Sequence, residues 1–185
     1  MNSTSIPEVS VLKLNKHIDK RGFILEIFEK ENFLEKNGVE FVVVSSSETY
    51  NNYMALRGLH YQVNKPQARL VRVSEGEIFD VAVDLRKSSP TFGKWRGEII
   101  SSKGHNAMFI PEGFAHGYLT LAAHSIVNIY ANSSWTPENQ RCIHWKDSSV
   151  NIDWPLFRDY PVVIEPLISE RDMNGNSFAD AEFYD

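Results

Sequence analysis

The chain lacks most features that mark secreted or membrane-bound proteins. Its 185 residues include a single cysteine, Cys142, so no intrachain disulfide can form, as is usual in a reducing compartment. No apolar run approaches the roughly 18 residues of a membrane span. The first residues show no basic segment followed by a long apolar one, so we expect no signal peptide. The sequence therefore predicts a cytoplasmic protein that does not contact a membrane.

Positive charge is also scarce. Lys and Arg number 19 against 24 Asp and Glu, which gives a net charge of −5 without any basic run. Because nucleic-acid binding depends on clustered cations, we expect no nucleic-acid partner. Aromatic residues make up 12% of the chain, which favours strands and ligand pockets over helical bundles. We expect one domain over residues 1–185.

Period-two patterning predicts an all-β fold. The segments "RLVRV" and "EIFDVAVDL", separated by a turn at "SEG", predict a hairpin. A strand is also expected over 40–48, and a helix over 30–36 that Asn37-Gly38 ends. Short strands at spacings of roughly 8 to 12 residues are typical of an antiparallel sandwich or jelly-roll barrel. In the strand 77–85, one face carries Phe79, Val81, Val83 and Leu85, and the other carries Asp80, Ala82 and Asp84.

Two histidines occupy positions where a barrel lumen would gather them. His60 lies in "RGLHYQ" and His116 follows "PEGFA". Taken singly, a histidine in a strand is more often structural than catalytic. Inward positions of neighbouring barrel strands converge, however, and Arg57 and Arg69 could project cations into the same lumen. An imidazole that acts as a base needs an orienting carboxylate, and the candidates are Asp80, Asp84 and Asp172.

Four segments carry a resemblance to a known family: "RGLHYQ", "LVRVSEGEIFDVAVDLRKSSPTFGKW", "IPEGFAHGY" and "IDWP". Together they resemble the dTDP-4-dehydrorhamnose 3,5-epimerases of the cupin superfamily, over roughly residues 7 to 175. The resemblance implies a cupin-type antiparallel jelly roll with short peripheral helices, without a metal or other cofactor. It also implies a homodimer and a nucleotide-diphosphate-linked 4-keto-6-deoxy sugar as substrate.

The resemblance also implies roles for individual residues around the base. His60 matches the catalytic base, and Asp172 in "SERD" matches the carboxylate that orients it. Arg57 matches a substrate-binding arginine beside the base, and His116 matches a second active-site histidine.

Other matched residues are expected to bind substrate or to donate a proton. Arg21 in "DKRGF" matches an arginine that reaches a nucleotide phosphate across the dimer, and Arg69 stands where the family has a lysine near the C4 oxygen. Tyr130 is the nearest match to a tyrosine acid. Gln62 and Trp135 complete the expected substrate-binding set, with Trp135 able to stack on a sugar or base.

The chemistry explains these residue types. Removing a proton from a carbon beside a ketone leaves an enolate, and a positioned base contributes about 10²–10⁴-fold to such a step. The developing oxyanion needs a cation or donor, which Arg69 could supply. Inversion requires a proton donor on the face opposite His60, which is the role expected of Tyr130. Guanidinium groups such as that of Arg57 suit a diphosphate because they grip it bidentately.

The sequence departs from the family pattern in two further places, before "RGLHYQ" and at the expected acid. "SSSET" at 45–49 replaces a usual Q-x-N-x-S, so the bound nucleotide or sugar is open. An ungapped match places Ile129 at the acid position. Period two groups Asn128 with Tyr130 on one face, and that polar face suits a wet pocket, so we predict that Tyr130 points into the barrel.

Other functions stay open on the sequence. A non-catalytic nucleotide-sugar-binding paralogue would keep the barrel without the acid, and a related 3,4-ketoisomerase would use the same enolate. A metal-dependent cupin is disfavoured because such barrels carry paired H-x-H ligands, whereas His60 is followed at plus two by Gln62. We therefore expect no metal site.

Overall fold

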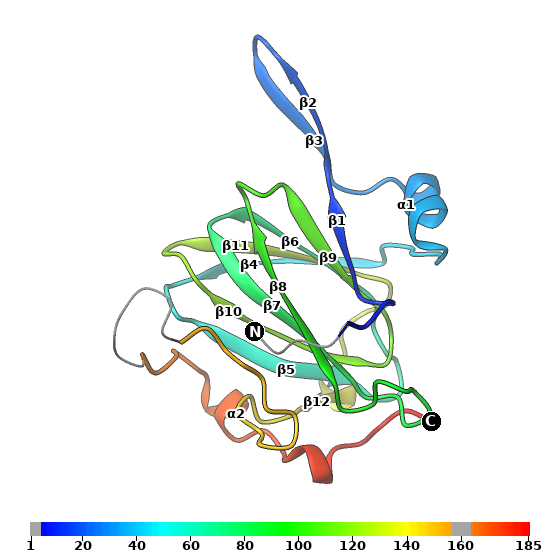
Figure 1. The fold of residues 1–185 in the computed structure, drawn as a ribbon, viewed down its shortest axis with the longest axis vertical. Coiled ribbons are helices and arrows are strands. Elements are labelled where there is room, and N and C mark those ends of the chain that lie inside the picture. The colour runs from blue at the N-terminus through cyan, green and yellow to red at the C-terminus, as the bar shows by residue number, and fades with distance from the viewer. Residues whose placement is uncertain (1–4, 157–163) are drawn as a thin grey trace.

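The computed structural model describes residues 5–156 and 164–185, which form two facing antiparallel sheets (Figure 1). The strand order is β1-β9-β6-β11-β4 in the first sheet and β12-β5-β10-β7-β8 in the second. The predicted all-β barrel of antiparallel strands is thereby confirmed. The first sheet comprises β1 (Ser10–Lys13), β9 (Asn106–Ile110), β6 (Arg69–Glu75), β11 (Ser125–Ala131) and β4 (Ser45–Asn51). The second comprises β12 (Gln140–Cys142), β5 (Leu56–Gln62), β10 (Phe114–Thr120), β7 (Glu77–Asp84) and β8 (Trp95–Ser101).

Two elements near the N-terminus lie outside these sheets. Strands β2 (Asn15–Asp19) and β3 (Gly22–Glu26) form a hairpin that extends away from the barrel (Figure 1). Helix α1 (Lys30–Asn37) begins where the Glu29 carboxylate accepts the N–H groups of Glu31 and Asn32. It ends at Gly38, as predicted, because this residue adopts the left-handed conformation that a helix C-cap requires.

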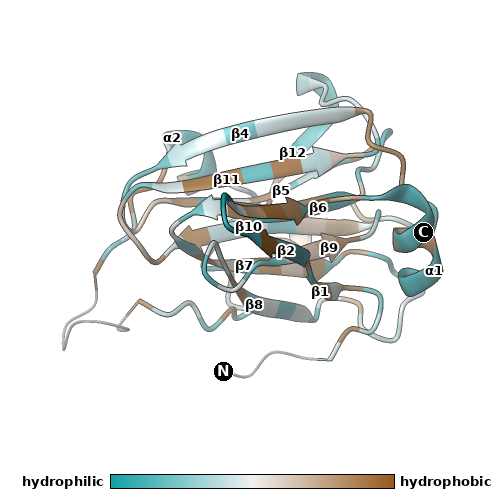
Figure 2. Cartoon of the chain, turned by 90° about the horizontal axis from the view of Figure 1, so that it is seen from above, coloured by the Kyte–Doolittle hydropathy of each residue, from teal (hydrophilic) through white to brown (hydrophobic). Residues whose placement is uncertain are grey.

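Apolar side chains form three layers across the molecule. The layer between the sheets joins residues of both, including Val71 and Val127 from one and Ile78 and Tyr118 from the other. The outer face of the second sheet is covered by C-terminal residues such as Trp145, Val150 and Trp154. The outer face of the first sheet is covered by Phe33 of α1 and by Phe41. In Figure 2, β4 and α1 are the pale to teal elements beside browner central strands.

The predicted hairpin between β6 and β7 is wrong. Strand β6 pairs with β9 and β11, whereas β7 pairs with β8 and β10, so the chain crosses from one sheet to the other. The turn at Gly76, with φ of 82°, carries this crossing, and a Cβ there would meet Ser125 at 2.4 Å. Period-two patterning identifies a strand and its faces but does not identify the neighbouring strand.

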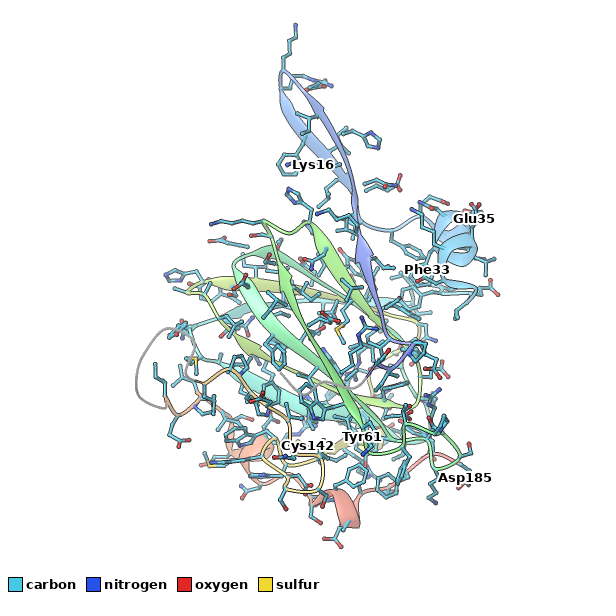
Figure 3. All side chains as sticks on the ribbon, in the orientation of Figure 1. Lys16, Phe33, Glu35, Tyr61, Cys142 and Asp185 are labelled. Atoms are coloured by element: carbon cyan, nitrogen blue, oxygen red, sulfur yellow. The ribbon has the colours of Figure 1, made fainter. Side chains whose placement is uncertain are left out.

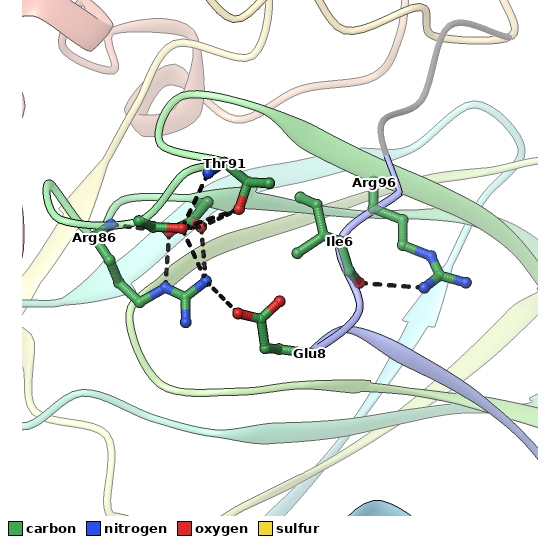
Figure 4. A network of polar contacts seen from close by, with 7 residues as sticks. Ile6, Glu8, Arg86, Thr91 and Arg96 are labelled. Atoms are coloured by element: carbon green, nitrogen blue, oxygen red, sulfur yellow. Dashed lines mark hydrogen bonds and ion pairs between the residues drawn. The ribbon is translucent and has the colours of Figure 1, made fainter.

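Asp84, a candidate orienting carboxylate, has a structural role instead. Its carboxylate accepts hydrogen bonds from Arg86 Nε at 2.9 Å, Ser89 Oγ at 2.6 Å and Thr91 Oγ1 at 2.7 Å (Figure 4). Burial alone raises the pKa of Asp84, but these bonds outweigh it and lower the pKa to about 2. Arg86 also pairs with Glu8, which fastens the N-terminal segment to the barrel.

The remaining elements lie in the loops and the C-terminal tail. They are η1 (Pro137–Asn139), α2 (Glu170–Met173) and η2 (Phe178–Asp180), which agree with the predicted short peripheral helices. The strand expected over 40–48 begins later, since β4 covers Ser45–Asn51. In the described ranges, no helix is long and apolar enough to cross a membrane.

Candidate active site

A cavity of about 470 Å³ opens between the two sheets. Four side chains of the second sheet form one side, which we call the imidazole wall: Arg57, His60, His116 and Tyr118. The first sheet forms the other side, which we call the serine wall: Ser45, Ser46, Ser47, Thr49, Arg69, Ile129 and Ala131. Gln67, Ser134, Trp135 and Gln140 complete the lining. The predicted convergence of His60, His116, Arg57 and Arg69 on the lumen is confirmed.

His60 is held by a carboxylate from the opposite end of the chain. Its Nε2 lies 2.7 Å from Asp172 Oδ1, and Asp172 Oδ2 accepts the N–H of Gly58 at 3.1 Å. Burial raises the pKa of Asp172, but the hydrogen bond from His60 and the bond from Gly58 keep it below the ordinary value. The ionised carboxylate therefore holds the proton on Nε2 and leaves Nδ1 as the proton-accepting nitrogen.

The Asp172 contact depends on the start of α2 and on a close approach of strands. Ser169 caps this short helix by accepting the N–H of Asp172 at 3.2 Å, which fixes the carboxylate beneath β5. A Cβ at Gly58 would lie 2.5 Å from Gly117 Cα on β10. Only glycine lets β5 run this close to β10 and place its N–H against Asp172.

His116 forms a second, deeper imidazole–carboxylate pair. Its Nε2 lies 2.7 Å from Asp80 Oδ1, and its side chain is 4% exposed. His116 and His60 are directly paired across β10 and β5, so both rings arise at one level of the barrel. Burial lowers the pKa of His116 more than Asp80 raises it, so the ring is neutral at neutral pH. Asp80 thus orients His116, whereas Asp172 orients His60.

The two arginines are positioned differently. Arg69 donates from Nη1 to the His60 carbonyl at 3.1 Å and from Nη2 to Gln67 Oε1 at 3.1 Å. Burial lowers the pKa of Arg69 to about 10, so it stays charged at neutral pH. Arg57 donates from Nε to Asn51 Oδ1 at 2.8 Å, and among the described residues its two terminal nitrogens make no further hydrogen bond.

Tyr118 is a site residue that the sequence analysis missed. It arises on β10, two residues after His116, and its hydroxyl lies 2.8 Å from Thr49 Oγ1 on β4. The phenol therefore spans the lumen from one sheet to the other. Burial raises the pKa of Tyr118, only partly offset by Thr49 and by the charge of Arg57, so it stays protonated. The sequence could have indicated this residue, because positions two apart on a strand, such as His116 and Tyr118, point to the same face.

Tyr130 does not face the cavity, and the prediction that it points inward is wrong. It packs on the outer face of the first sheet, in the layer that contains Phe41 and Leu70. Its neighbour Ile129 lines the cavity instead. The lumen of this barrel is largely a packed core. The apolar residues of β11, Val127 and Ile129, therefore face inward, and Tyr130 faces outward. The structure therefore does not bring Tyr130 and His60 together.

Gln62 also lies away from the cavity, contrary to the expected substrate contact. Its amide nitrogen donates to the carbonyls of Lys65 and Ser134, and its oxygen accepts the N–H of Thr136 at 2.6 Å. All of these partners belong to backbone, so the side chain holds the loop after β11. Gln62 supports the cavity only indirectly, because that loop carries Trp135.

Trp135 and Arg21 are both exposed to solvent. Trp135 lines the cavity with 54% of its surface exposed, and its indole N–H donates to Gln140. Arg21 lies at the tip of the β2–β3 hairpin and pairs with Asp19 at 2.6 Å. Within one chain, Arg21 does not line the cavity.

Comparisons with known proteins agree with this geometry. A sequence model of the family described as dTDP-4-dehydrorhamnose 3,5-epimerase matches residues 3–180. The dTDP-4-dehydrorhamnose 3,5-epimerase of Pseudomonas aeruginosa is 42% identical over 180 residues, covering 97% of this chain and 96% of that protein.

Two solved structures show the range of relatives. A dTDP-6-deoxy-D-glucose-3,5-epimerase from Legionella pneumophila, in complex with dTDP-4-keto-L-rhamnose, aligns with a TM-score of 0.89 and 34% identity, covering 97% of this chain and 93% of that one. ChmJ, a 3'-monoepimerase from Streptomyces bikiniensis in complex with dTDP-quinovose, aligns with a TM-score of 0.84 and 29% identity, covering 97% and 88%. The cupin-type jelly roll is thereby confirmed, and the chain belongs to the dTDP-4-dehydrorhamnose 3,5-epimerase family.

Proposed function

We propose that the protein epimerises a nucleotide-diphosphate-linked 4-keto-6-deoxy sugar at C3, C5 or both, in deoxysugar biosynthesis in the cytoplasm. Membership in the family makes it an isomerase, as predicted. The observation that carries the proposal is the His60–Asp172 pair, at 2.7 Å, whose imidazole lines a cavity of about 470 Å³. A cavity of this size suits a small sugar and part of its diphosphate.

The imidazole wall supplies the base. Nδ1 of His60 accepts the proton from the carbon beside the ketone, and Asp172 stabilises the imidazolium that forms. The enolate oxygen gains charge in this step. Arg69 is charged and half-buried beside His60, and the His116 ring adds a neutral donor or acceptor at the same level. Each group is anchored from behind by a residue outside the cavity or by backbone.

Inversion needs a second donor, and we assign it to Tyr118. Its side chain starts on the sheet of His60, but its hydroxyl reaches Thr49 on the facing sheet. Tyr118 is the phenol among the described residues that line the cavity. Its raised pKa keeps the transferable proton in place at neutral pH. Thr49 can return a proton to it along the hydrogen bond.

The nucleotide part of the substrate is assigned to the cations and to the exposed rim. Arg57 has two terminal nitrogens without a partner in the described ranges, and they suit a diphosphate oxygen pair. Trp135 offers an exposed aromatic face for a base or sugar. The relatives described above bind dTDP-linked sugars. That makes a dTDP sugar the first substrate to test.

A homodimer completes the proposal. The β2–β3 hairpin exposes Ile18 at 73%, Ile24 at 68% and Phe23 at 56%, although these side chains are apolar. A second copy of the chain would cover them and remove the free edges of the hairpin. In that arrangement the hairpin would carry Arg21 to the partner's cavity, where it would meet a phosphate. Sedimentation showing only monomer at micromolar concentration would count against this part.

A second candidate is a related ketoisomerase, or an enzyme that inverts one centre only. The observation that favours it is Ile129, a hydrocarbon side chain with no acidic proton to donate, on the wall opposite His60. Proton NMR in D₂O, with a panel of nucleotide-linked 4-keto-6-deoxy sugars, distinguishes these reactions. Exchange and inversion at C3 or C5 support epimerisation, a shifted ketone signal supports ketoisomerisation, and no exchange with any sugar overturns both.

A further inference from the structure

Behind His60, away from the cavity, three different metal-binding groups converge. Cys142 on β12 is the direct cross-strand neighbour of His60 on β5, and Asp172 approaches both from α2. One ligand atom from each residue lies within 4.8 Å of the other two. In the described part of the chain, this is the one cluster of three such groups. Figure 3 labels Cys142 on the side of the barrel where α2 lies.

We propose that His60 Nε2, Cys142 Sγ and Asp172 Oδ1 form an inhibitory binding site for a divalent zinc-like cation. Imidazole nitrogen, thiolate sulfur and carboxylate oxygen are the ligands that Zn²⁺ prefers, and three of them with one water complete a tetrahedron. Bond lengths of about 2.0–2.3 Å place tetrahedral ligand atoms about 3.3–3.7 Å apart. The observed separations from Asp172 Oδ1 are 2.7 Å to Nε2 and 4.0 Å to Sγ. The third separation, from the His60 nitrogen to Sγ, is within 4.8 Å, so shifts of about 1 Å would form the site.

Binding of the cation releases one proton from the protein. The Cys142 thiol releases its proton to solvent as the S–Zn bond forms, so thiolate and carboxylate together neutralise the 2+ ion. Because binding releases this proton, we expect the affinity for the cation to rise with pH.

The site would switch off the base without filling the cavity. The imidazole proton that Asp172 holds on Nε2 must leave that nitrogen when the cation binds there. In neutral imidazole it then lies on Nδ1, which removes the lone pair that faces the substrate. Cys142 does not line the cavity. We therefore expect kcat to fall with little change in KM, a consequence that rests on the proposed function.

The binding test does not depend on any substrate. Metal-free protein is titrated with Zn²⁺ by calorimetry and with Co²⁺ by absorption spectroscopy, for the wild type, Cys142→Ser and His17→Asn. His17 lies on the exposed hairpin and serves as the matched histidine control. We expect one Zn²⁺ per chain, a thiolate-to-cobalt charge-transfer band, and at least about tenfold weaker binding only in Cys142→Ser. Mg²⁺, which prefers oxygen ligands, is expected not to compete.

A second measurement uses the unmutated chain. Zn²⁺ is expected to protect the Cys142 thiol from alkylation, and Mg²⁺ is not. With a sugar that the enzyme turns over, Cys142→Ser should keep the basal rate and resist Zn²⁺. Equal Zn²⁺ affinity in Cys142→Ser, the absence of a thiolate band, or unprotected alkylation would each overturn the site. Absence of turnover with every sugar would overturn the proposed function and leave these binding results standing.

Discussion

The two walls of the cavity differ in how their side chains are supported. On the imidazole wall, the two histidines are held from behind, His60 by Asp172 and His116 by Asp80. Arg57 and Tyr118 of the same wall are held instead by Asn51 and Thr49 of β4, on the facing sheet. The serine wall instead carries short hydroxyls, Ile129 and Ala131, with Arg69 as its cation. Under the proposed function, the sheet of the imidazole wall supplies the base and the second proton donor, and carboxylates pre-orient both of its histidines. The other sheet would contribute the Arg69 cation and the walls of the space for the sugar.

The largest effect is expected from removing the base. His60→Asn should lower both carbon-proton exchange and turnover by about 10²–10⁴-fold, because asparagine cannot accept the proton. Proton NMR in D₂O measures the exchange, and circular dichroism checks the fold. Ser47→Ala, a matched change on the serine wall, should keep the rate within a few-fold. Similar losses in both variants would remove the distinction between the walls.

A smaller loss is expected from the orienting carboxylate. Asp172→Asn keeps the shape of the side chain but removes its negative charge, so either ring nitrogen of His60 can carry the proton. We therefore expect kcat to fall on the order of 10²-fold. Because Asp172 does not line the cavity, KM should change little. The limb of the pH profile that reports the base should shift as well. An unchanged kcat and pH profile would remove Asp172 from the mechanism.

The smallest effect concerns stability on the imidazole wall. Burial holds the pKa of His116 below its ordinary 6.5, so below that pH the unfolded chain binds a proton that the folded chain does not. The free energy of unfolding should therefore decrease as pH falls from 6.5 towards the folded pKa, by at most about 1.4 kcal/mol per pH unit. His116→Gln should flatten this slope in urea titrations, whereas His17→Asn on the hairpin should not. A slope that persists in His116→Gln would assign it to other groups.

The sequence predicted the fold and one wall well for physical reasons. Strand alternation identified the faces of β7. The residues alone left Asp80, Asp84 and Asp172 as candidate partners of His60, and it was the family resemblance of "RGLHYQ" and "SERD" that paired His60 with Asp172, 112 positions away. Strand partners were harder, because patterning does not encode which sheet a strand joins. That is why β6 and β7 were expected to form a hairpin.

The serine wall was harder to predict because polarity misled the choice of face. In β11, the expectation that Asn128 and Tyr130 face a wet pocket treated the lumen as polar. The lumen is mostly packed, so Val127 and Ile129 point inward. The prediction that Gln62 contacts substrate failed for a related reason. A polar side chain near the base can instead form hydrogen bonds with the backbone of a neighbouring loop, as Gln62 does with Thr136.

The central claim is that the tyrosine of β10, and not that of β11, donates the second proton. The most direct measurement compares exchange and inversion by proton NMR in D₂O for Tyr118→Phe and Tyr130→Phe. We expect Tyr118→Phe to lose inversion by about 10²-fold while His60 still exchanges the carbon proton, and Tyr130→Phe to match the wild type in both. Loss of inversion in Tyr130→Phe, with Tyr118→Phe unaffected, would contradict the account.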